Sequence, residues 1–207
     1  MDNAVKKRRG GPRTFDRDQA VDVAMRLFWR HGYEGVSLND LTSAIGVAPP
    51  SIYAAFGSKA GLYREALDRY FGPRGVQIGS NATATLPDAV ESMLRNAVDA
   101  VTDPAGERGC MVSSGMLQCA PEHAALASEL TGRRREMRET ISKAFLRWLD
   151  QDRAAALARL VTTIMQGLSV QARDGATRQE LYQVVNETVA GVRATIVPST
   201  AYAGGDR

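Results

Sequence analysis

The chain has 207 residues, of which 44% are hydrophobic and 24% charged, a composition typical of globular proteins and not of disordered or fibrous ones. No apolar run is long enough to span a membrane, and the N-terminus lacks the apolar segment of a secretion signal, so we expect a cytoplasmic protein. Two cysteines, Cys110 and Cys119, are too few for a disulfide scaffold and lack the paired spacing of a zinc site. We therefore expect no metal and no cofactor.

The net charge of +3 is concentrated at the N-terminal end of the chain. The first 60 residues hold nine Lys and Arg against six Asp and Glu, and most of the excess lies within residues 1–13. Clustered basic residues favour a polyanion, because their binding releases counterions from phosphates. A nucleic-acid partner and a solubilising tail both fit this basic arm, which does not decide between them.

Apolar residues recur every three or four positions along almost the whole chain, which predicts an all-α fold. The first helix is expected to start after Asp16, a good N-cap residue, and to end at Gly32. Ser37, with Asp40 three residues later, has the spacing of a capping box, and it predicts a second helix that stops at Gly46. A third, short helix is expected from Pro49-Pro50 to about Phe56-Gly57, since proline is tolerated in the first turn.

Helices of about eight residues are not stable alone, so the first three helices are expected to pack as one unit. We predict a flexible basic arm over 1–13, a three-helix helix-turn-helix domain over 14–60, a larger helical domain over 61–198, and a tail over 199–207. Ser58 is expected to cap a fourth helix that ends or kinks at 72–75. Further helices are expected over about 86–102, 109–119, 122–149, 153–173 and 178–196.

The second and third helices, joined at 45–47, have the pattern of a helix-turn-helix, whose second helix enters the DNA major groove. Residues 32–41 (GYEGVSLNDL) and 45–59 (IGVAPPSIYAAFGSK) closely resemble the corresponding segments of the TetR family of bacterial transcriptional regulators. The resemblance covers about residues 14–67. It implies a homodimer that binds a double-stranded DNA operator, most often as a repressor, and whose C-terminal domain binds a small-molecule effector.

The resemblance also implies which residues contact DNA. Residues 48–55 include no Arg, Lys, Asn or Gln, so sequence specificity is expected to depend on Asn39, Ser51, thymine methyl groups and DNA shape. Tyr53 is expected on phosphate, whereas Phe56 is expected in the core. The expected DNA-contacting residues are Asn39, Ala48, Pro49, Ser51, Tyr53 and Lys59, with Arg13 of the basic arm.

The last two long helices each carry an apolar stripe, and in the TetR family these two helices build the dimer interface. The alternative is that both stripes are buried within one subunit. The expected interface residues are Leu157, Leu160, Val161, Ile164, Leu168, Val184, Val185, Thr188 and Val189.

Several methionines lie on the helices expected to surround an effector cavity, where flexible thioethers suit apolar ligands. The alternative is that they fill gaps in the core. The expected effector-pocket residues are Met93, Cys110, Met111, Ser114, Gln118, Met137, Met165 and Ser169.

The Gly109-Cys110 pair resembles a motif of a TetR branch that includes regulators responding to electrophiles. In the first turn of a helix and close to Arg108, Cys110 is expected to have a lowered thiol pKa, which would suit a chemical sensor. The alternative, which we favour, is a small buried residue that packs the floor of the pocket. Two further functions stay open: an architectural DNA-binding protein without an effector, and an enzyme with Cys110 as nucleophile, for which no histidine partner is evident.

Overall fold

The computed structural model of the chain describes residues 16–74 and 85–196. Within these ranges the chain is helical and contains no strand, which confirms the all-α prediction. No helix in the described part of the chain is long and apolar enough to cross a membrane. The helices are α1 (Arg17–His31), α2 (Leu38–Ile45), α3 (Pro49–Phe56), α4 (Lys59–Arg74), α5 (Leu86–Val101), the short 3-10 helix η1 (Pro121–His123), α6 (Ala124–Phe145), α7 (Gln151–Arg173) and α8 (Arg178–Ile196).

The helix ends follow the capping residues of the sequence. The Asp16 carboxylate accepts the backbone N–H of Gln19 at 3.1 Å, and α1 begins at the next residue after Asp16. Ser37 and Asp40 form the predicted capping box of α2, and the hydrogen bonds that Asp40 accepts from Ser37 lower the pKa of its carboxyl group. α4 is described as far as Arg74 and is helical through Gly72 and Pro73, and the rest of the segment predicted to end or kink it lies outside the described residues.

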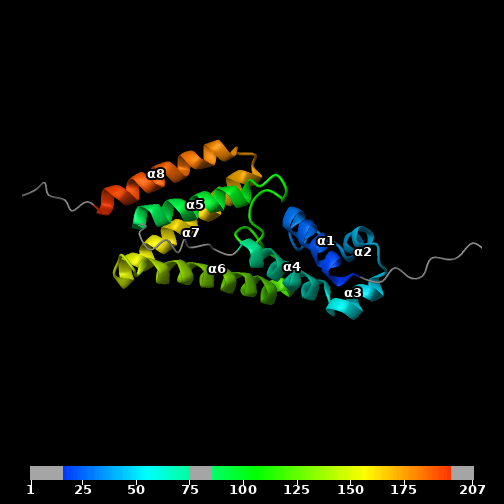
Figure 1. The fold of residues 1–207 in the computed structure, drawn as a ribbon. Helices are drawn as coiled ribbons and strands as arrows, with labels where there is room; N and C mark the ends of the chain where they lie inside the picture. Colours follow the sequence, from blue (N-terminus) through cyan, green and yellow to red (C-terminus); the bar gives the residue numbers. More distant parts are fainter. Residues whose placement is uncertain (1–15, 75–84, 197–207) are drawn as a thin grey trace, which may run out of the picture.

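The helices form an elongated molecule with two ends (Figure 1). α1, α2 and α3 gather at one end, α5, α7 and α8 lie at the other, and α4 and α6 connect them along one side. We call α1–α3 the headpiece and α5–α8 the C-terminal bundle. Each end has its own group of buried hydrophobic residues.

The first core is built around aromatic side chains between α1 and α4. Phe28 meets the ring of Tyr63 edge to face, with 4.9 Å between centroids, and Trp29 meets Tyr70 in the same way at 5.0 Å. Outside this core, Arg69 of α4 forms ion pairs with two aspartates of α1. α4 therefore packs with the headpiece, although the sequence-based boundary after residue 60 assigns it to the larger domain.

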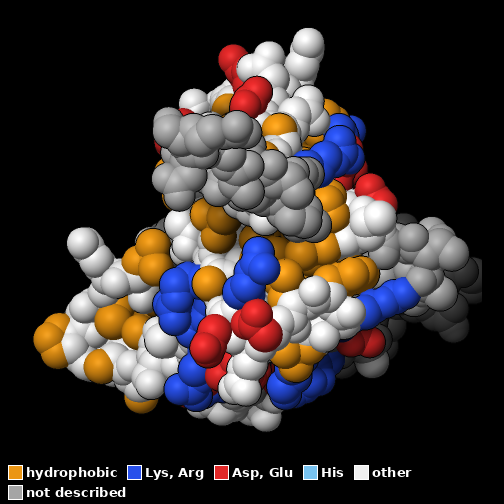
Figure 2. Space-filling model, turned by 90° about the vertical axis from the view of Figure 1, so that its left-hand side faces the viewer, with side chains coloured by type: hydrophobic (Ala, Val, Ile, Leu, Met, Phe, Trp, Pro, Cys, Tyr) orange, Lys and Arg blue, Asp and Glu red, His pale blue; other side chains and the backbone are white. Residues whose placement is uncertain are grey.

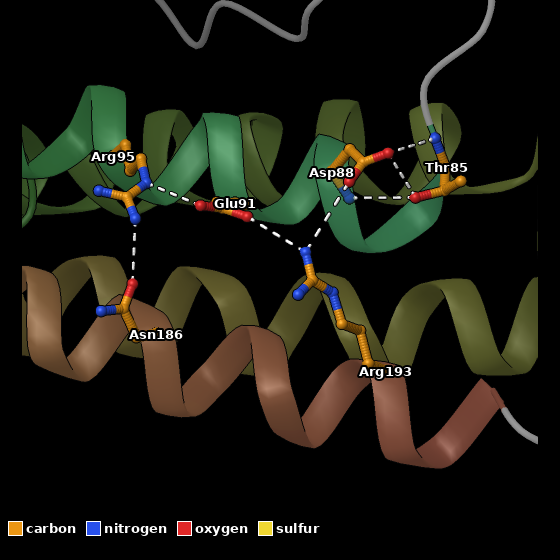
Figure 3. Close-up of polar contacts among 6 residues, drawn as sticks. All are labelled: Thr85, Asp88, Glu91, Arg95, Asn186 and Arg193. Atoms are coloured by element: carbon orange, nitrogen blue, oxygen red, sulfur yellow. Dashed lines mark hydrogen bonds and ion pairs between the residues drawn. The ribbon is translucent and has the colours of Figure 1, made fainter.

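The second core lies in the C-terminal bundle. Outside this core, polar contacts link α5 to α8 (Figure 3). Arg95 bonds Glu91 of its own helix at 2.9 Å and the side chain of Asn186 on α8 at 3.0 Å. From α8, Arg193 lies 3.4 Å from Glu91 and 4.0 Å from Asp88. These exposed contacts add to the buried packing between the two helices.

The predicted helix over 109–119 is wrong, because residues 102–120 form turns and bends instead. Gly109 has a φ of 81° and Met116 a φ of 49°, and neither value fits a right-handed helix. The segment is held by partners elsewhere, since Arg134 of α6 donates to the carbonyls of Val112 and Gly115, both at 2.9 Å. We call residues 102–120 the connecting loop.

The connecting loop joins the headpiece to the C-terminal bundle at one buried contact. The indole Nε1–H of Trp29, whose side chain is 1% exposed, donates to the carbonyl of Gly109 at 2.9 Å. Arg173 of α7 donates to the carbonyl of Trp29 at 2.7 Å. That carbonyl lies in the last turn of α1, where carbonyls lack a partner within the helix and favour a positive charge. We call Trp29, Gly109 and Arg173 the joint.

Ion pairs and hydrogen bonds surround the joint. Arg30 forms a two-pronged ion pair with Glu107, at 2.7 and 2.9 Å, and the hydrogen bonds from Arg30 lower the pKa of the Glu107 carboxyl group. Arg108 donates to the carbonyl of Ala172, in the last turn of α7, and to that of Ala176, just after the helix. The loop between α5 and α6 is thereby attached to both α1 and α7.

We predict that Gly109→Ala lowers the free energy of unfolding by about 2 kcal/mol, because an added side chain is strained at positive φ. A Cβ atom there would also lie 2.9 Å from the carbonyl oxygen of Ser169. The matched control is Gly132→Ala in α6, where a Cβ meets nothing within 4 Å and replacement of a helical glycine stabilises by about 1 kcal/mol. Thermal unfolding measures both changes, and a Gly109→Ala variant as stable as the parent contradicts the prediction.

Candidate functional site

The headpiece holds a helix-turn-helix in the predicted place. Gly46 makes the turn in a left-handed conformation, with φ 79° and ψ 35°. Leu41 of α2 and Ile52 of α3 are both 0% exposed and pack in the first core, and Val47 packs against it. The two short helices are therefore fixed to each other and to α1 and α4.

The structure places four of the predicted contact residues on the outer surface of α2 and α3. Asn39, Ala48, Pro49 and Tyr53 are exposed, whereas Ser51 is half-buried. Tyr53 is 53% exposed and its neighbour along the helix, Phe56, only 8%, which confirms the core position expected for Phe56. Contact of these exposed residues with DNA stays a prediction.

Lys59 lies at the first turn of α4, beside α3. The Ser58 hydroxyl accepts the N–H of Gly61 at 3.0 Å, as predicted for a cap. The ammonium group of Lys59 lies 4.3 Å from the centre of the Tyr33 ring, and partial burial lowers its pKa. A cation next to a helix N-terminus makes a favourable position for an anion. Arg13, the remaining predicted contact, lies outside the described residues.

Arg17 is a positioning residue of the headpiece that the sequence analysis missed. It forms a two-pronged ion pair with Glu65 of α4, with both distances 2.6 Å, and donates to the carbonyl of Ala55 at 3.2 Å. Its guanidinium also stacks on Phe56, 4.8 Å from the ring centre. Arg17 thus holds the end of α3 against α1 and α4, and no local sequence pattern indicates partners so distant along the chain.

The residues predicted for an effector pocket fall into different parts of the molecule. Met111 is buried in the first core and Met93 in the second, while Met137 and Met165 pack against the second. Gln118 is exposed on the connecting loop. Cys110, Ser114 and Ser169 lie together next to the joint, where Ser169 is fully buried. Of this set, Met137 lines the pocket described next, and that the others contact an effector stays a prediction.

A pocket of about 350 Å³ lies between the end of α4 and α6. Its lining combines apolar side chains with one basic and one acidic group, and among the predicted residues it includes Met137. Arg133 bonds Asp68 at 2.5 Å and lies 5.4 Å from the centre of the Phe71 ring. The lining residues are Phe71, Arg133, Glu136, Met137 and Thr140.

Cys110 lies in a turn, so the helix N-terminus expected to activate its thiol is not there. Its backbone N–H donates to the hydroxyl of Ser169 at 2.8 Å, and its sulfur accepts the N–H of Ser113 at 3.4 Å. The half-buried side chain packs against both cores. Cys110 and Cys119 are both free thiols. Among the described residues no three His, Cys, Asp or Glu side chains gather as metal ligands.

The structure corrects part of the predicted dimer interface. Val161, Leu168, Val185 and Val189 are buried within the second core of the single chain, with at most 3% of each exposed. They pack inside the subunit, because their side of α7 and α8 lies against α5 and α6 of the same chain. Leu160 is 50% exposed. The other four predicted residues, Leu157, Ile164, Val184 and Thr188, are half-buried.

α7 and α8 nevertheless keep an exposed face of apolar and small residues. On α7 the spacing of three and four places Leu160, Thr163, Gly167 and Val170 on one side. On α8 the exposed small residues are Ala190, Gly191 and Ala194. Small residues allow two helices to approach closely, so these faces suit contact with another helical surface.

The end of the molecule farthest from the headpiece has a mixed surface. Figure 2 shows this end, where hydrophobic side chains lie between groups of basic and acidic ones. A surface that binds nucleic acid through phosphates is uniformly basic. The described surface in this view therefore shows no uniformly basic patch, and the predicted DNA-contacting residues within the described ranges lie at the opposite end of the molecule.

Comparison with protein families gives a match that covers most of the headpiece and the start of α4. Residues 20–66 match the family described as "Bacterial regulatory proteins, tetR family". This segment contains α2, α3, most of α1 and the first half of α4, and so includes the whole helix-turn-helix.

Curated proteins and solved structures extend the similarity beyond the headpiece. The chain is 35% identical over 202 residues to the HTH-type transcriptional repressor ComR of Escherichia coli K12, covering 89% of this chain and 92% of ComR. It is 31% identical over 174 residues to the repressor BdcR of the same strain, covering 83% and 86%. A cysteine-substituted form of the TetR family transcriptional regulator CifR, complexed with 26-base-pair operator DNA, matches with a TM-score of 0.76 and 38% identity, over 87% of this chain and 98% of CifR.

Proposed function

The chain belongs to the TetR family of bacterial transcriptional regulators, and we propose that it is a repressor which binds a palindromic operator as a homodimer and leaves it when a small-molecule effector binds. The observation that carries the proposal is the exposed outer surface of α2 and α3 beside Lys59, in a fold that matches an operator-bound relative. A cytoplasmic location and the lack of an enzymatic activity are part of the same proposal.

Selection of binding sites from a pool of random DNA duplexes tests the proposal. Two-fold symmetric proteins with this motif place their recognition helices about 34 Å apart, so the selected sites should be palindromes with half-sites about one helical turn apart. A reporter gene downstream of the selected site should be silenced by the protein. Failure to enrich any sequence, or activation of the reporter, contradicts the proposal.

Effector release requires that the C-terminal bundle influence the headpiece, and the joint supplies a physical connection. Arg173 at the end of α7 holds the last turn of α1, and Trp29 holds the connecting loop. We propose that an effector in the bundle alters these contacts and so the spacing of the two headpieces. The coupling cannot exceed the difference in the effector's affinity for the two states, and a hundredfold release of DNA needs about 2.7 kcal/mol.

The pocket lined by Met137 is our candidate site for the effector. It lies between α4, which packs on the headpiece, and α6 of the bundle. Its volume fits a small organic molecule, and its apolar walls with one basic and one acidic group suit an amphipathic one. The pocket favours this function over that of an architectural DNA-binding protein without an effector.

A thiol-responsive regulator is the alternative, and one observation favours it. Cys110 follows the joint residue Gly109 and packs against both cores, so an adduct on its sulfur would disturb the contact between them. Treatment with an aldehyde or quinone followed by mass spectrometry and DNA-binding assays tests this sensor. If Cys110 is not modified, or if Cys110→Ser is released as the parent is, the covalent mechanism is wrong.

We predict that Lys59→Ala weakens operator binding and lowers the slope of log affinity against log salt by about one unit, because Lys59 contacts one phosphate. Tyr53→Phe, which removes only a hydroxyl group, should weaken binding without changing the slope. The matched control is Lys143→Ala, an exposed lysine of α6. Titrations at several salt concentrations measure the effects, and an unchanged affinity and slope for Lys59→Ala refute its assignment.

We also predict that Leu160→Asp shifts the protein from dimer to monomer, because it introduces a charge into the proposed contact face of α7. Leu146→Asp is the matched control, since Leu146 is also 50% exposed but lies at the far end of α6. Light scattering after size-exclusion chromatography gives the molar mass of each variant. A dimer of parent affinity in Leu160→Asp places the interface elsewhere.

A further inference from the structure

The outer face of α3 carries almost no group that can form a hydrogen bond with a base. Its exposed residues are Pro49, Pro50, Tyr53 and Ala54, preceded by the exposed Ala48. Only Tyr53 among them has a polar side chain. Ser51, the other polar residue of the helix, is half-buried, and Ile52 and Phe56 lie in the core.

The polar groups next to α3 do not supply the missing hydrogen-bonding groups. Both terminal nitrogens of Arg17 bond the carboxylate of Glu65, and one of them also bonds the carbonyl of Ala55. The hydroxyl of Thr42 donates to the carbonyl of Asn39, and Thr42 is buried. Asn39 and Ser43 are exposed, but they belong to α2. Within the described headpiece, the surface formed by α3 itself is therefore apolar except for the hydroxyl group of Tyr53.

An apolar helix can recognise one feature of the major groove. Guanine, cytosine and adenine present hydrogen-bonding groups and ring C–H groups there, whereas thymine alone presents a methyl group, which alanine and similar side chains contact. Polar base edges pressed against an apolar surface lose their water without gaining a partner, which costs free energy. A thymine methyl group offsets this cost by burying apolar surface.

We propose that α3 selects its operator by contact with thymine methyl groups, and that Ala48 and Pro49 are the specificity-determining residues. The N-terminal residues of a recognition helix are the ones that reach base edges, and these two are exposed at that end of α3. The inference rests on the proposed operator binding. It specifies which chemical group of the DNA is recognised at the centre of each half-site.

Replacement of thymine by deoxyuridine in the selected operator tests the proposal, because it removes the methyl group and keeps every hydrogen-bonding group of the base pair. Single substitutions across the half-site should show a position where affinity falls about fourfold, the effect expected for one methyl group. Substitution at the symmetric positions of both half-sites should lower affinity about sixteenfold. Substitutions outside the segment covered by α3 should change affinity less than twofold.

Protein variants assign the methyl contact to its residues. Ala48→Gly removes one methyl group at the N-cap position, where glycine is tolerated. Pro49→Ala removes the ring carbons beyond Cβ from the first residue of α3. At least one of them should bring the thymine-to-uracil affinity ratio close to one. The matched control is Pro87→Ala in the first turn of α5, which should keep the parent ratio.

The outcomes separate this inference from the proposed function. If no operator is selected at all, operator binding itself fails. If an operator is bound but no deoxyuridine substitution changes its affinity, methyl recognition by α3 is wrong while the protein remains a DNA-binding regulator. If the ratio persists in both Ala48→Gly and Pro49→Ala, these residues do not carry the contact and the assignment is overturned.

Discussion

The contact between Trp29 and Gly109 is the constraint on which the arrangement of the two ends depends. The indole bonds a carbonyl of the connecting loop inside the first core, and Arg173 reaches the same turn of α1 from α7. A buried hydrogen bond of this kind is costly to leave unmade. The connecting loop therefore cannot move relative to α7 without affecting α1. In a regulator, this coupling suits the transmission of a conformational change from the C-terminal bundle to the headpiece.

The buried contact also explains why the connecting loop is not helical. A regular helix over 109–119 would direct its backbone groups to one another, whereas here Arg134, Ser169 and Trp29 bond them from three different helices. Positive φ at Gly109 turns its carbonyl toward the indole. Cys110 is the next residue after Gly109, so the same turn of the backbone places its side chain between the two cores.

Packing also decides which faces of α7 and α8 are buried within the subunit and which remain exposed. α7 lies against α5, α6 and α8, so its broad apolar surface is mostly used within the subunit, and residues such as Val161 belong to the core. What is left for a partner is a narrower face that includes Leu160 and Gly167. An apolar stripe on a helix shows that the face is buried, but it does not show whether the same chain or another chain buries it.

The sequence by itself determined the local structure and the family. Caps at Asp16 and Ser37, the glycine of the turn at residue 46 and the spacing of apolar residues are local features, so they predicted the helices of the headpiece and its helix-turn-helix. Only the tertiary structure decided the joint, the clamp formed by Arg17 and the split of the methionines between two cores. These depend on partners tens of residues apart, and such contacts follow from how the helices pack and not from any local pattern.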